Sequence, residues 1–199
     1  MARNRQPINK RSRALGISTG DMGYTKKPSN RNPGSQRRTK KSEYAMQLNE
    51  KQKVKFVYGI LEKQMHKYYV KASNQKGNTG DNMLVLIERR LDNVAYRLNF
   101  GKTRRMARQM VTHGHLLVNG EKVDIPSYQI KAGDEISVCS KSRDIPFFKT
   151  LREEGSERSI PQWLELDAEN LKGRVVALPT RADVDMPIEE HLIVELYSR

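Results

Sequence analysis

The sequence has a single cysteine and few apolar residues, and each shortage excludes a class of protein. Cys139 alone can form neither an internal disulfide nor a cysteine-built zinc site, and we expect it to be a small buried hydrophobe. Hydrophobic residues are 36% of the 199 positions, and none of their runs is long enough to cross a bilayer. Residues 1–20 also lack the apolar core of a signal peptide. These shortages predict a soluble cytoplasmic protein with one or two small cores.

Groups that catalyse reactions or hold metals are also scarce. Of the four histidines, only His113 and His115 lie near each other, and no acidic or sulfur ligand set accompanies them. No Ser-His-Asp or Cys-His arrangement stands out. The loop Lys76–Asp81 lacks the glycine spacing and the Lys-Ser/Thr ending of a nucleotide-binding P-loop. We therefore expect no metal, no cofactor, no small-molecule substrate and no enzymatic activity.

Acidic residues are scarce at one end of the chain. The sequence contains 37 Lys and Arg against 23 Asp and Glu, which gives a net charge of +14. Residues 1–41 hold twelve Lys and Arg and one acid, whereas residues 150–199 hold six Lys and Arg and eleven acids. Such a gradient favours an acidic polymer or surface as the partner. Nucleic acid is the preferred interpretation, and an anionic membrane is the competing one.

Residues 1–41 contain few large apolar side chains, so they cannot bury enough surface to offset the entropy lost on ordering. They carry basic doublets, among them Arg37-Arg38 and Lys40-Lys41. Two interpretations remain open: a solvated basic tail, or a segment that folds when it contacts RNA. The local charge excess favours the second.

Apolar residues recur at steps of three and four from Ser42 to Ser73, a spacing typical of amphipathic helices. Gly59 is expected to divide this segment into two helices. Lys51, Lys53 and Lys55 crowd the first helix, where they either form a solvated face or contact RNA.

The loop Lys76–Asp81 is expected to be a turn between helices, with Asp81 as the next N-cap. Apolar positions between Leu84 and Leu98 then mark one long helix or two in succession. Three arginines are expected on the outward side: Arg89, Arg90 and Arg97.

Residues 101–123 combine a short basic helix with a small β-hairpin. Thr103 is a suitable N-cap, and Asn119–Gly120 is a strong two-residue hairpin turn. One side of the helix is apolar: Met106, Met110 and Val111. Cations gather on the other side: Lys102, Arg104, Arg105 and Arg108. This arrangement is typical of a protein that binds phosphate backbones.

The rest of the chain predicts further strands and a last helix. Apolar residues at 128–130 and 136–138 flank a turn at 132–134, which favours another strand pair. A strand is expected at 173–178 and a helix at 188–197. The acidic balance of this region suits packing on the basic body of the protein.

We therefore predict an α+β fold with an antiparallel sheet. Its parts are an extended basic arm (1–41), a helical domain (42–90) that the C-terminal segment completes, a small α/β RNA-binding module (91–150), and a C-terminal strand and helix that pack on the body (151–199).

A series of short motifs runs through residues 42–199: Glu50–Val54 with Tyr58–Gly59, Lys76–Gly80, Glu88–Val94, Ala107–Val111, His113–Gly120 and Leu192–Tyr197. Together they resemble the small-subunit ribosomal proteins of the universal number-four family, in its bacterial type. Several members of that family hold zinc with cysteines in the N-terminal arm. This chain has no cysteine there, so it resembles the zinc-free branch.

The resemblance implies a structural component of the small ribosomal subunit that binds 16S rRNA directly, nucleates assembly of the subunit body and contributes to translational accuracy. It also implies contact with neighbouring small-subunit protein five, and that residues 91–150 are the RNA-binding module named after this family. The run Arg37-Arg38-Thr39-Lys40-Lys41 is similar in placement to family residues that line the path of messenger RNA into the ribosome.

We expect basic side chains to contact rRNA phosphates, with neighbouring polar and aromatic groups adding hydrogen bonds or stacking. The expected rRNA-binding residues are Lys51, Lys53, Lys55, Asn78, Thr79, Arg89, Arg90, Arg97, Lys102, Thr103, Arg104, Arg105, Arg108, Gln109, His113, His115, Asn119, Lys122 and Tyr128. The alternative function is a stand-alone RNA-binding or ribosome-associated factor that uses the same module. An RNA-modifying enzyme would need an appended catalytic domain.

Overall fold

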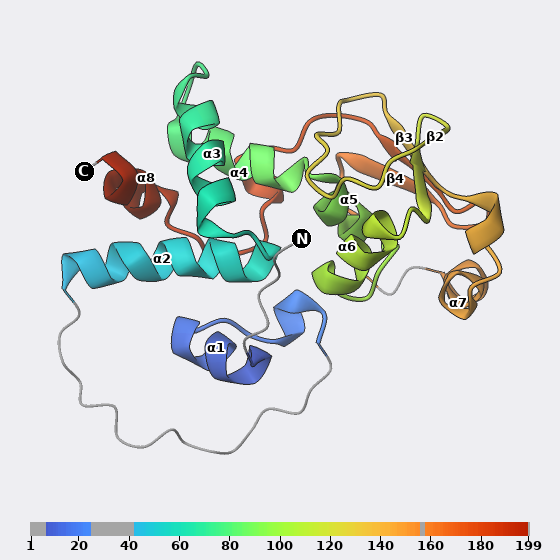
Figure 1. Cartoon of the computed structure of the whole chain (residues 1–199), viewed down its shortest axis with the longest axis horizontal. Coiled ribbons are helices and arrows are strands. Elements are labelled where there is room, and N and C mark those ends of the chain that lie inside the picture. The colour runs from blue at the N-terminus through green and yellow to red at the C-terminus, as the bar shows by residue number, and fades with distance from the viewer. Residues whose placement is uncertain (1–6, 25–41, 156–157, 199) are drawn as a thin grey trace. The chain divides into compact units, whose positions relative to one another are not determined.

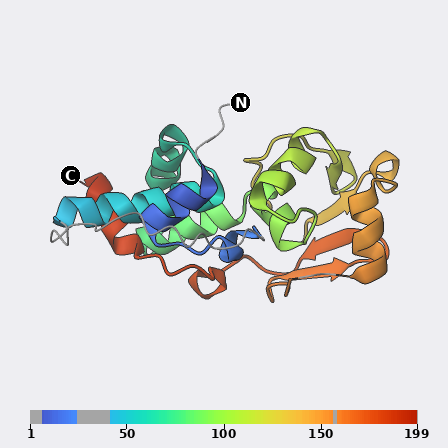
Figure 2. The ribbon, with the colours of Figure 1, turned by 90° about the horizontal axis from the view of Figure 1, so that it is seen from below.

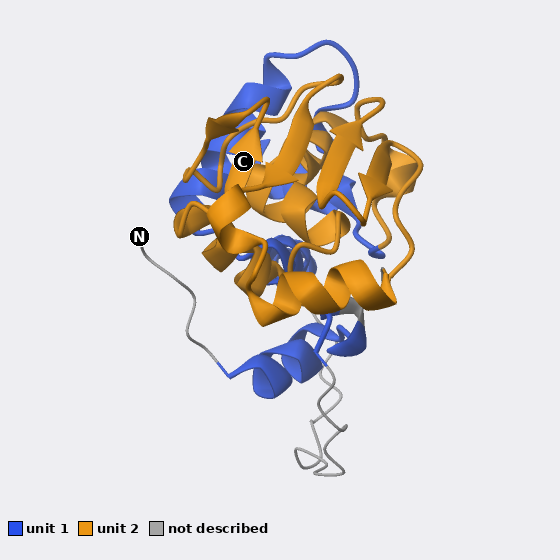
Figure 3. Ribbon diagram, turned by 90° about the vertical axis from the view of Figure 1, so that its right-hand side faces the viewer, with its two compact units in different colours: residues 1–80, 186–199 blue, residues 81–185 orange. Residues whose placement is uncertain are grey.

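The computed structural model describes residues 7–24, 42–155 and 158–198 (Figure 1). The chain divides into two compact units, coloured separately in Figure 3. Unit 1 contains Met1–Gly80 and Met186–Arg199, and unit 2 contains Asp81–Asp185. The C-terminal end of the chain therefore completes the unit that the N-terminal part begins.

Unit 1 is helical in its described residues. Its elements are α1 (Ile8–Leu15), the 3₁₀ helix η1 (Gly20–Met22), α2 (Glu43–Tyr58), α3 (Glu62–Ser73) and α8 (Glu190–Ser198). Ser42 caps α2, because its hydroxyl accepts a hydrogen bond from the backbone N–H of Ala45 at 3.3 Å. Gly59 ends α2 with a φ of +64°, which glycine adopts without a Cβ clash. The predicted division of this segment into two helices is confirmed.

Helix α1 is an element that the sequence pattern does not predict. Leu15 and Met22 are only 4% and 5% exposed, so this part of the arm does contribute buried apolar surface. The guanidinium of Arg11 donates to the Gln52 side chain of α2 at 3.2 Å, and Figure 2 shows α1 against α2. The expectation of an extended arm is therefore wrong for Ile8–Leu15, which forms a helix that packs on α2.

Unit 2 contains helices and all the described strands. Its helices are α4 (Thr79–Glu88, whose first two residues belong to unit 1), α5 (Leu91–Arg97), α6 (Arg104–Thr112) and α7 (Pro146–Glu154), with the 3₁₀ helices η2 (Ser140–Ser142) and η3 (Arg181–Asp183). Its strands are β1 (Leu116–Val118), β2 (Glu121–Lys122), β3 (Glu135–Val138), β4 (Leu164–Asp167) and β5 (Lys172–Val175).

The strands form one antiparallel sheet in the order β2-β1-β3-β5-β4. Leu116 pairs with Val138 and Val118 with Ile136, so the buried residues of both strands lie on one face. That face packs with α5, α6 and α7 in the core of the unit, where Phe100 and Phe148 meet edge to face at 6.3 Å. The predicted α+β fold with an antiparallel sheet is confirmed.

Several local expectations differ from the structure. Helix α4 begins at Thr79, because Asn78 Oδ1 accepts the Gly80 N–H at 2.9 Å, so Asp81 is a first-turn residue and not the N-cap. Residues 128–130 form a single bridge, Gln129 to Arg90, in place of a strand. The expected pairing partner of β3 is replaced by β1 on one side and β5 on the other.

The C-terminal segment is shared between the units. Strands β4 and β5 extend the sheet of unit 2, whereas α8 packs against α2 and α3 of unit 1. The side chain of Ile193 is fully buried there. Gly80 lies so close to α8 that a Cβ would come within 2.6 Å of Glu190 Cγ. In the part of the chain that the structure describes, no helix is long and apolar enough to cross a membrane.

Candidate nucleic-acid interface

Helix α6 is fixed at its N-terminus by two local features. The Thr103 hydroxyl accepts the backbone N–H of Met106 at 3.2 Å, which confirms the predicted cap. Gly101 lets the preceding loop approach the helix, because a Cβ at this position would lie 2.5 Å from the Ala107 nitrogen. Ala107 and Val111 are the fully buried residues of α6, whereas Met106 and Met110 are half-buried. The helix thus turns one side to the core and the other to solvent.

The solvent side of α6 and the adjoining hairpin expose a set of cationic and polar side chains. We call them the α6 face: Lys102, Arg105, Gln109, His113 and Lys122. Positions 105, 109 and 113 follow one another at steps of four, so they lie on one side of the helix. The Lys122 side chain lies across Gly114, where a Cβ would come within 2.7 Å of Nζ. The α6 face therefore presents several donors and positive charges on a rigid backbone.

His115 lies at the edge of the α6 face and is half-buried. Its Nδ1 lies 2.8 Å from Ser142 Oγ, and its ring centroid lies 5.9 Å from that of His113. Desolvation lowers the pKa of His115, and the charges of His113 and Lys122 lower it further. The ring is therefore a neutral hydrogen-bonding group at pH 7.

Arg90 and Arg97 do not face outward as predicted. Arg90 is 3% exposed, and its guanidinium donates two hydrogen bonds to the Asp92 carboxylate, at 3.0 and 2.7 Å. Arg97 is 8% exposed and donates to both carboxylate oxygens of the fully buried Glu88, at 3.2 and 2.9 Å, and also pairs with Asp185. The expected outward orientation is wrong for both, because carboxylates neutralise them inside unit 2: Asp92 pairs with Arg90, and Glu88 and Asp185 pair with Arg97.

Two arginines of α6 are half-buried and turn toward α5. Arg104 donates from Nε to Asn93 Oδ1 at 2.9 Å, and its guanidinium lies 4.3 Å from the Tyr96 ring centroid. Arg108 pairs with Asp92 at 3.2 Å. These contacts anchor α6 to α5, so both side chains have a structural role beside any contact with RNA.

Arg89 is half-buried, and its Nε donates to the Ile130 carbonyl at 3.0 Å. Desolvation lowers the pKa of its guanidinium, and the charge of Asp134 offsets part of that effect. Even a lowered arginine pKa leaves the group charged at neutral pH. Arg89 is thus a charged side chain that supports the 128–130 segment.

The lysines of α2 are bound inside unit 1. Lys51 and Lys55 both reach Glu62 of α3, at 2.9 and 2.7 Å, and Lys53 pairs with Glu50. Their side chains are between 13% and 21% exposed. Contact with RNA would require these lysines to share or exchange their carboxylate partners.

Other predicted residues have local roles in the fold. Asn119 has a φ of +52°, and its side chain accepts from the Glu135 N–H and donates to Asp134, each at 2.9 Å. Tyr128 is 38% exposed and its backbone carbonyl accepts the Leu91 N–H at 2.9 Å. Asn78 and Thr79 form the start of α4. Arg37, Arg38, Lys40 and Lys41 lie outside the described residues.

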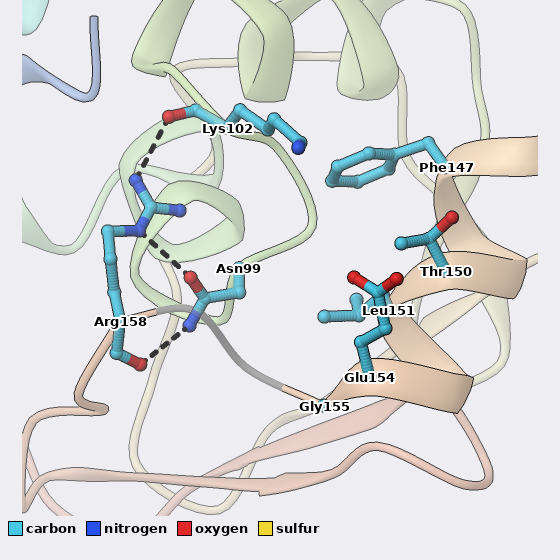
Figure 4. Close-up of a pocket in the computed structure, with 8 residues that line it drawn as sticks. All are labelled: Asn99, Lys102, Phe147, Thr150, Leu151, Glu154, Gly155 and Arg158. Carbon is cyan, nitrogen blue, oxygen red and sulfur yellow. Dashed lines mark hydrogen bonds between the residues drawn. The ribbon is translucent and has the colours of Figure 1, made fainter. Parts of the chain in front are cut away.

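Arg158 is the residue in this region that the sequence pattern missed. It comes from the acidic C-terminal region, yet it reaches the loop before α6 and hydrogen-bonds Asn99 and the Lys102 carbonyl (Figure 4). A small pocket lies beside it, bounded by Lys102 on one side and by Phe147 and Glu154 of α7 on the other. No local pattern marks Arg158, because its partners lie more than fifty residues earlier in the chain.

Within residues 7–24, 42–155 and 158–198, no three His, Cys, Asp or Glu side chains gather as metal ligands. Cys139 is half-buried just after β3 rather than within the strand, and it is a free thiol.

Comparison with known proteins gives two family matches that together span residues 3–136. Residues 3–88 match the ribosomal protein S4/S9 N-terminal domain, and residues 89–136 match the S4 domain. The second match contains the whole α6 face. The fold, the α6 face and these matches define the class, which is a ribosomal protein that carries an S4 domain.

Relatives extend this likeness over the full chain. The small ribosomal subunit protein uS4 of Nocardioides sp. (strain ATCC BAA-499 / JS614) is 51% identical over 201 residues, which cover all of both chains. That of Lachnospira eligens is 50% identical over 199 residues, again covering both chains. That of Ruminiclostridium cellulolyticum is 57% identical over 164 residues, 82% of this chain and 79% of the relative. This chain belongs to the small ribosomal subunit protein uS4 family, which confirms the resemblance seen in the sequence.

Proposed function

We propose that this protein is a structural component of the small ribosomal subunit, and that it binds 16S rRNA directly through the α6 face. Family membership supports the place in the subunit. The mode of binding is inferred from one observation: the side chains at positions 105, 109 and 113 form an exposed row on α6, beside Lys122. A phosphate backbone is the natural partner of such a row, because lysine and arginine neutralise phosphates and release counterions. As a component of the small subunit, the protein acts in the cytoplasm.

Recognition by this face follows RNA shape more than base sequence. Double-helical RNA hides its base edges in a deep, narrow groove and displays phosphates and 2′-hydroxyls. Arg105 and Lys122 suit phosphates, while Gln109 and His113 suit hydroxyls or unpaired bases. Because the spacing of these four side chains is fixed, they fit an RNA junction whose phosphates and hydroxyls lie at the same spacing.

The finer role in the subunit is also part of the proposal. The protein nucleates assembly of the subunit body, contributes to translational accuracy and contacts small-subunit protein five. Arg37, Arg38, Lys40 and Lys41 contact messenger RNA or rRNA near the path into the ribosome. Its role is structural and not enzymatic. A structural component stays with small subunits after washing in high salt, whereas a loosely associated factor is released.

The salt dependence of binding tests the α6 face. Each phosphate contact adds about 0.7 to 0.9 to the slope of log affinity against log salt concentration. We expect Arg105→Ala to weaken binding to 16S rRNA severalfold. It should also reduce the magnitude of that slope by about 0.7 to 0.9, the contribution of one phosphate contact. The measurement is filter binding of the full-length protein across a salt series.

Arg174→Ala is the matched control, because Arg174 is exposed on β5 and carries the same charge away from the α6 face. It should leave both affinity and slope nearly unchanged. Equal effects from the two substitutions would show that only net charge matters, and would contradict a defined interface.

A further inference from the structure

Arg158 brings together several backbone carbonyls in front of α6. Its Nη2 donates to the carbonyls of Tyr96 and Gly101 at 3.1 and 2.8 Å, and its Nη1 donates to that of Lys102 at 3.1 Å. Its Nε donates to Asn99 Oδ1 at 2.9 Å, and the Asn99 amide donates back to the Arg158 carbonyl at 3.2 Å (Figure 4). The planar fork of one guanidinium thus links the end of α5 to the start of α6.

The loop that Arg158 holds is conformationally demanding. Asn99 has a φ of +61°, a conformation that side-chain-bearing residues adopt rarely. Gly101 is pressed against the first turn of α6 at the Ala107 nitrogen. The carbonyl of Tyr96 lies in the last turn of α5, where it accepts the Asn99 N–H at 3.1 Å as well as the bond from Arg158. Without the Arg158 guanidinium, the carbonyls of Gly101 and Lys102 would turn toward water and the loop would lose its shape.

Arg158 also contributes to a stack that includes α6 itself. Its guanidinium lies 4.0 Å from the Tyr96 ring centroid, and that of Arg104 lies 4.3 Å from the same centroid. Tyr96 is 5% exposed, so the ring is a fixed support for both. The position of Arg104, and with it the first turn of α6, therefore depends on Tyr96 and Arg158 together.

We infer that Arg158 is a positioning residue for rRNA binding, which sets the loop 99–102 and the first turn of α6 so that Lys102 and Arg105 face the RNA backbone. This inference rests on the function proposed above. Arg158 acts through hydrogen bonds to the loop and not by contacting phosphates, so its shape matters more than its charge. A lysine, a compact ammonium on a flexible stem, cannot satisfy the same set of acceptors.

The test compares Arg158→Lys, Arg158→Gln and the wild type in the full-length protein. Both variants should lower affinity for 16S rRNA about tenfold, a loss of about 1.4 kcal/mol. The slope of log affinity against log salt should remain that of the wild type, because Lys102 and Arg105 still reach the phosphates in the complex and the variant adds only the cost of ordering the loop. Amide hydrogen exchange of the free variants should show about tenfold lower protection at Met106 and Ala107, which bond to Thr103 in the cap and first turn.

Val175→Ala controls for stability alone, because Val175 is 1% exposed in β5 and lies outside the loop. It should destabilise unit 2 without changing affinity or the protection at Met106 and Ala107. Rescue by Arg158→Lys, a reduced salt slope, or unchanged protection in Arg158→Gln would each overturn the inference. Failure of the wild type to bind 16S rRNA would overturn the proposed function instead, while the exchange data would still decide whether Arg158 sets the loop.

Discussion

Glu88 is a fully buried carboxylate whose oxygens accept hydrogen bonds from two side chains, those of Arg97 and Asn93. Arg97 donates to both of its oxygens, and the Asn93 amide donates to Oε2. A buried charge is costly when it loses its partner, although a complete buried pair adds little net stability. Loss of the Glu88 carboxylate would therefore be costly, because the buried Arg97 guanidinium would lose one of its two carboxylate partners.

At the scale of single residues, we predict that Glu88→Gln lowers the free energy of unfolding by about 3 kcal/mol. The amide keeps the shape of the side chain but removes the charge that Arg97 faces. Urea denaturation monitored by circular dichroism measures the change. Glu165→Gln, at an exposed position of β4, is the control and should shift stability by less than about 0.5 kcal/mol. Equal stability of both variants would contradict the role given to Glu88.

Residues with local roles were predictable from the sequence, and residues with distant partners were not. Thr103 and Asn119–Gly120 act within a few positions, so their residue types reveal the cap and the turn. Arg97, in contrast, pairs with Asp185, which lies 88 positions later in the chain. Helical periodicity identifies the polar side of α5 but does not reveal that another segment covers it.

At the scale of elements, α8 is held to unit 1 by a polar and aromatic cluster around its last turn. The Tyr197 hydroxyl donates to Glu62 at 2.9 Å, and its ring lies 4.9 Å from that of Tyr69. Burial alone would raise the pKa of Glu62, but hydrogen bonds from Lys55, Lys51 and Tyr197 outweigh it and lower the pKa to about 2. Desolvation raises the pKa of Tyr197, and its bond to Glu62 raises it further.

This cluster predicts an acid-sensitive attachment of α8. The folded-state pKa of Glu62 lies below its ordinary value of 4.5, so its contribution is complete above pH 4.5 and is lost as pH falls toward 2. Because the Glu62 side chain is 48% exposed, we expect only about 1 kcal/mol. Unfolding free energies of the wild type and Glu62→Gln should differ at pH 6 and converge by about pH 2. A constant difference across that range would rule out titration of Glu62 as the cause.

Elements with strong local signals could be predicted from the sequence, and elements that depend on distant contacts could not. Helices α2 and α6 carry side-chain N-caps, α3 carries apolar periodicity, and all three form where expected. Helix α1 was missed because only Leu15 is both large and buried within it, too weak a signal in a basic segment. The 128–130 segment has the composition of a strand, but its backbone contacts Arg89 and Arg90 and not β3.

At the scale of the whole molecule, the basic and acidic parts of the chain have different roles. The cationic groups of the α6 face belong to unit 2, while the acidic C-terminal region supplies β4, β5 and α8 to the two units. That region contributes Arg158 and Asp185, which support residues of α5 and of the loop before α6. The family could be predicted from short motifs, whereas the places of β4 and β5 in the sheet could not, because no local sequence pattern determines strand order.

Hydroxyl-radical footprinting of 16S rRNA tests the central claim most directly. We predict that the full-length protein protects the backbone of one multi-helix junction, and that a variant combining Arg105→Ala with Lys122→Ala loses part of that protection at discrete nucleotides. Arg174→Ala should leave the footprint unchanged. Diffuse protection spread along the RNA, or a footprint that the double variant does not alter, would contradict docking through the α6 face.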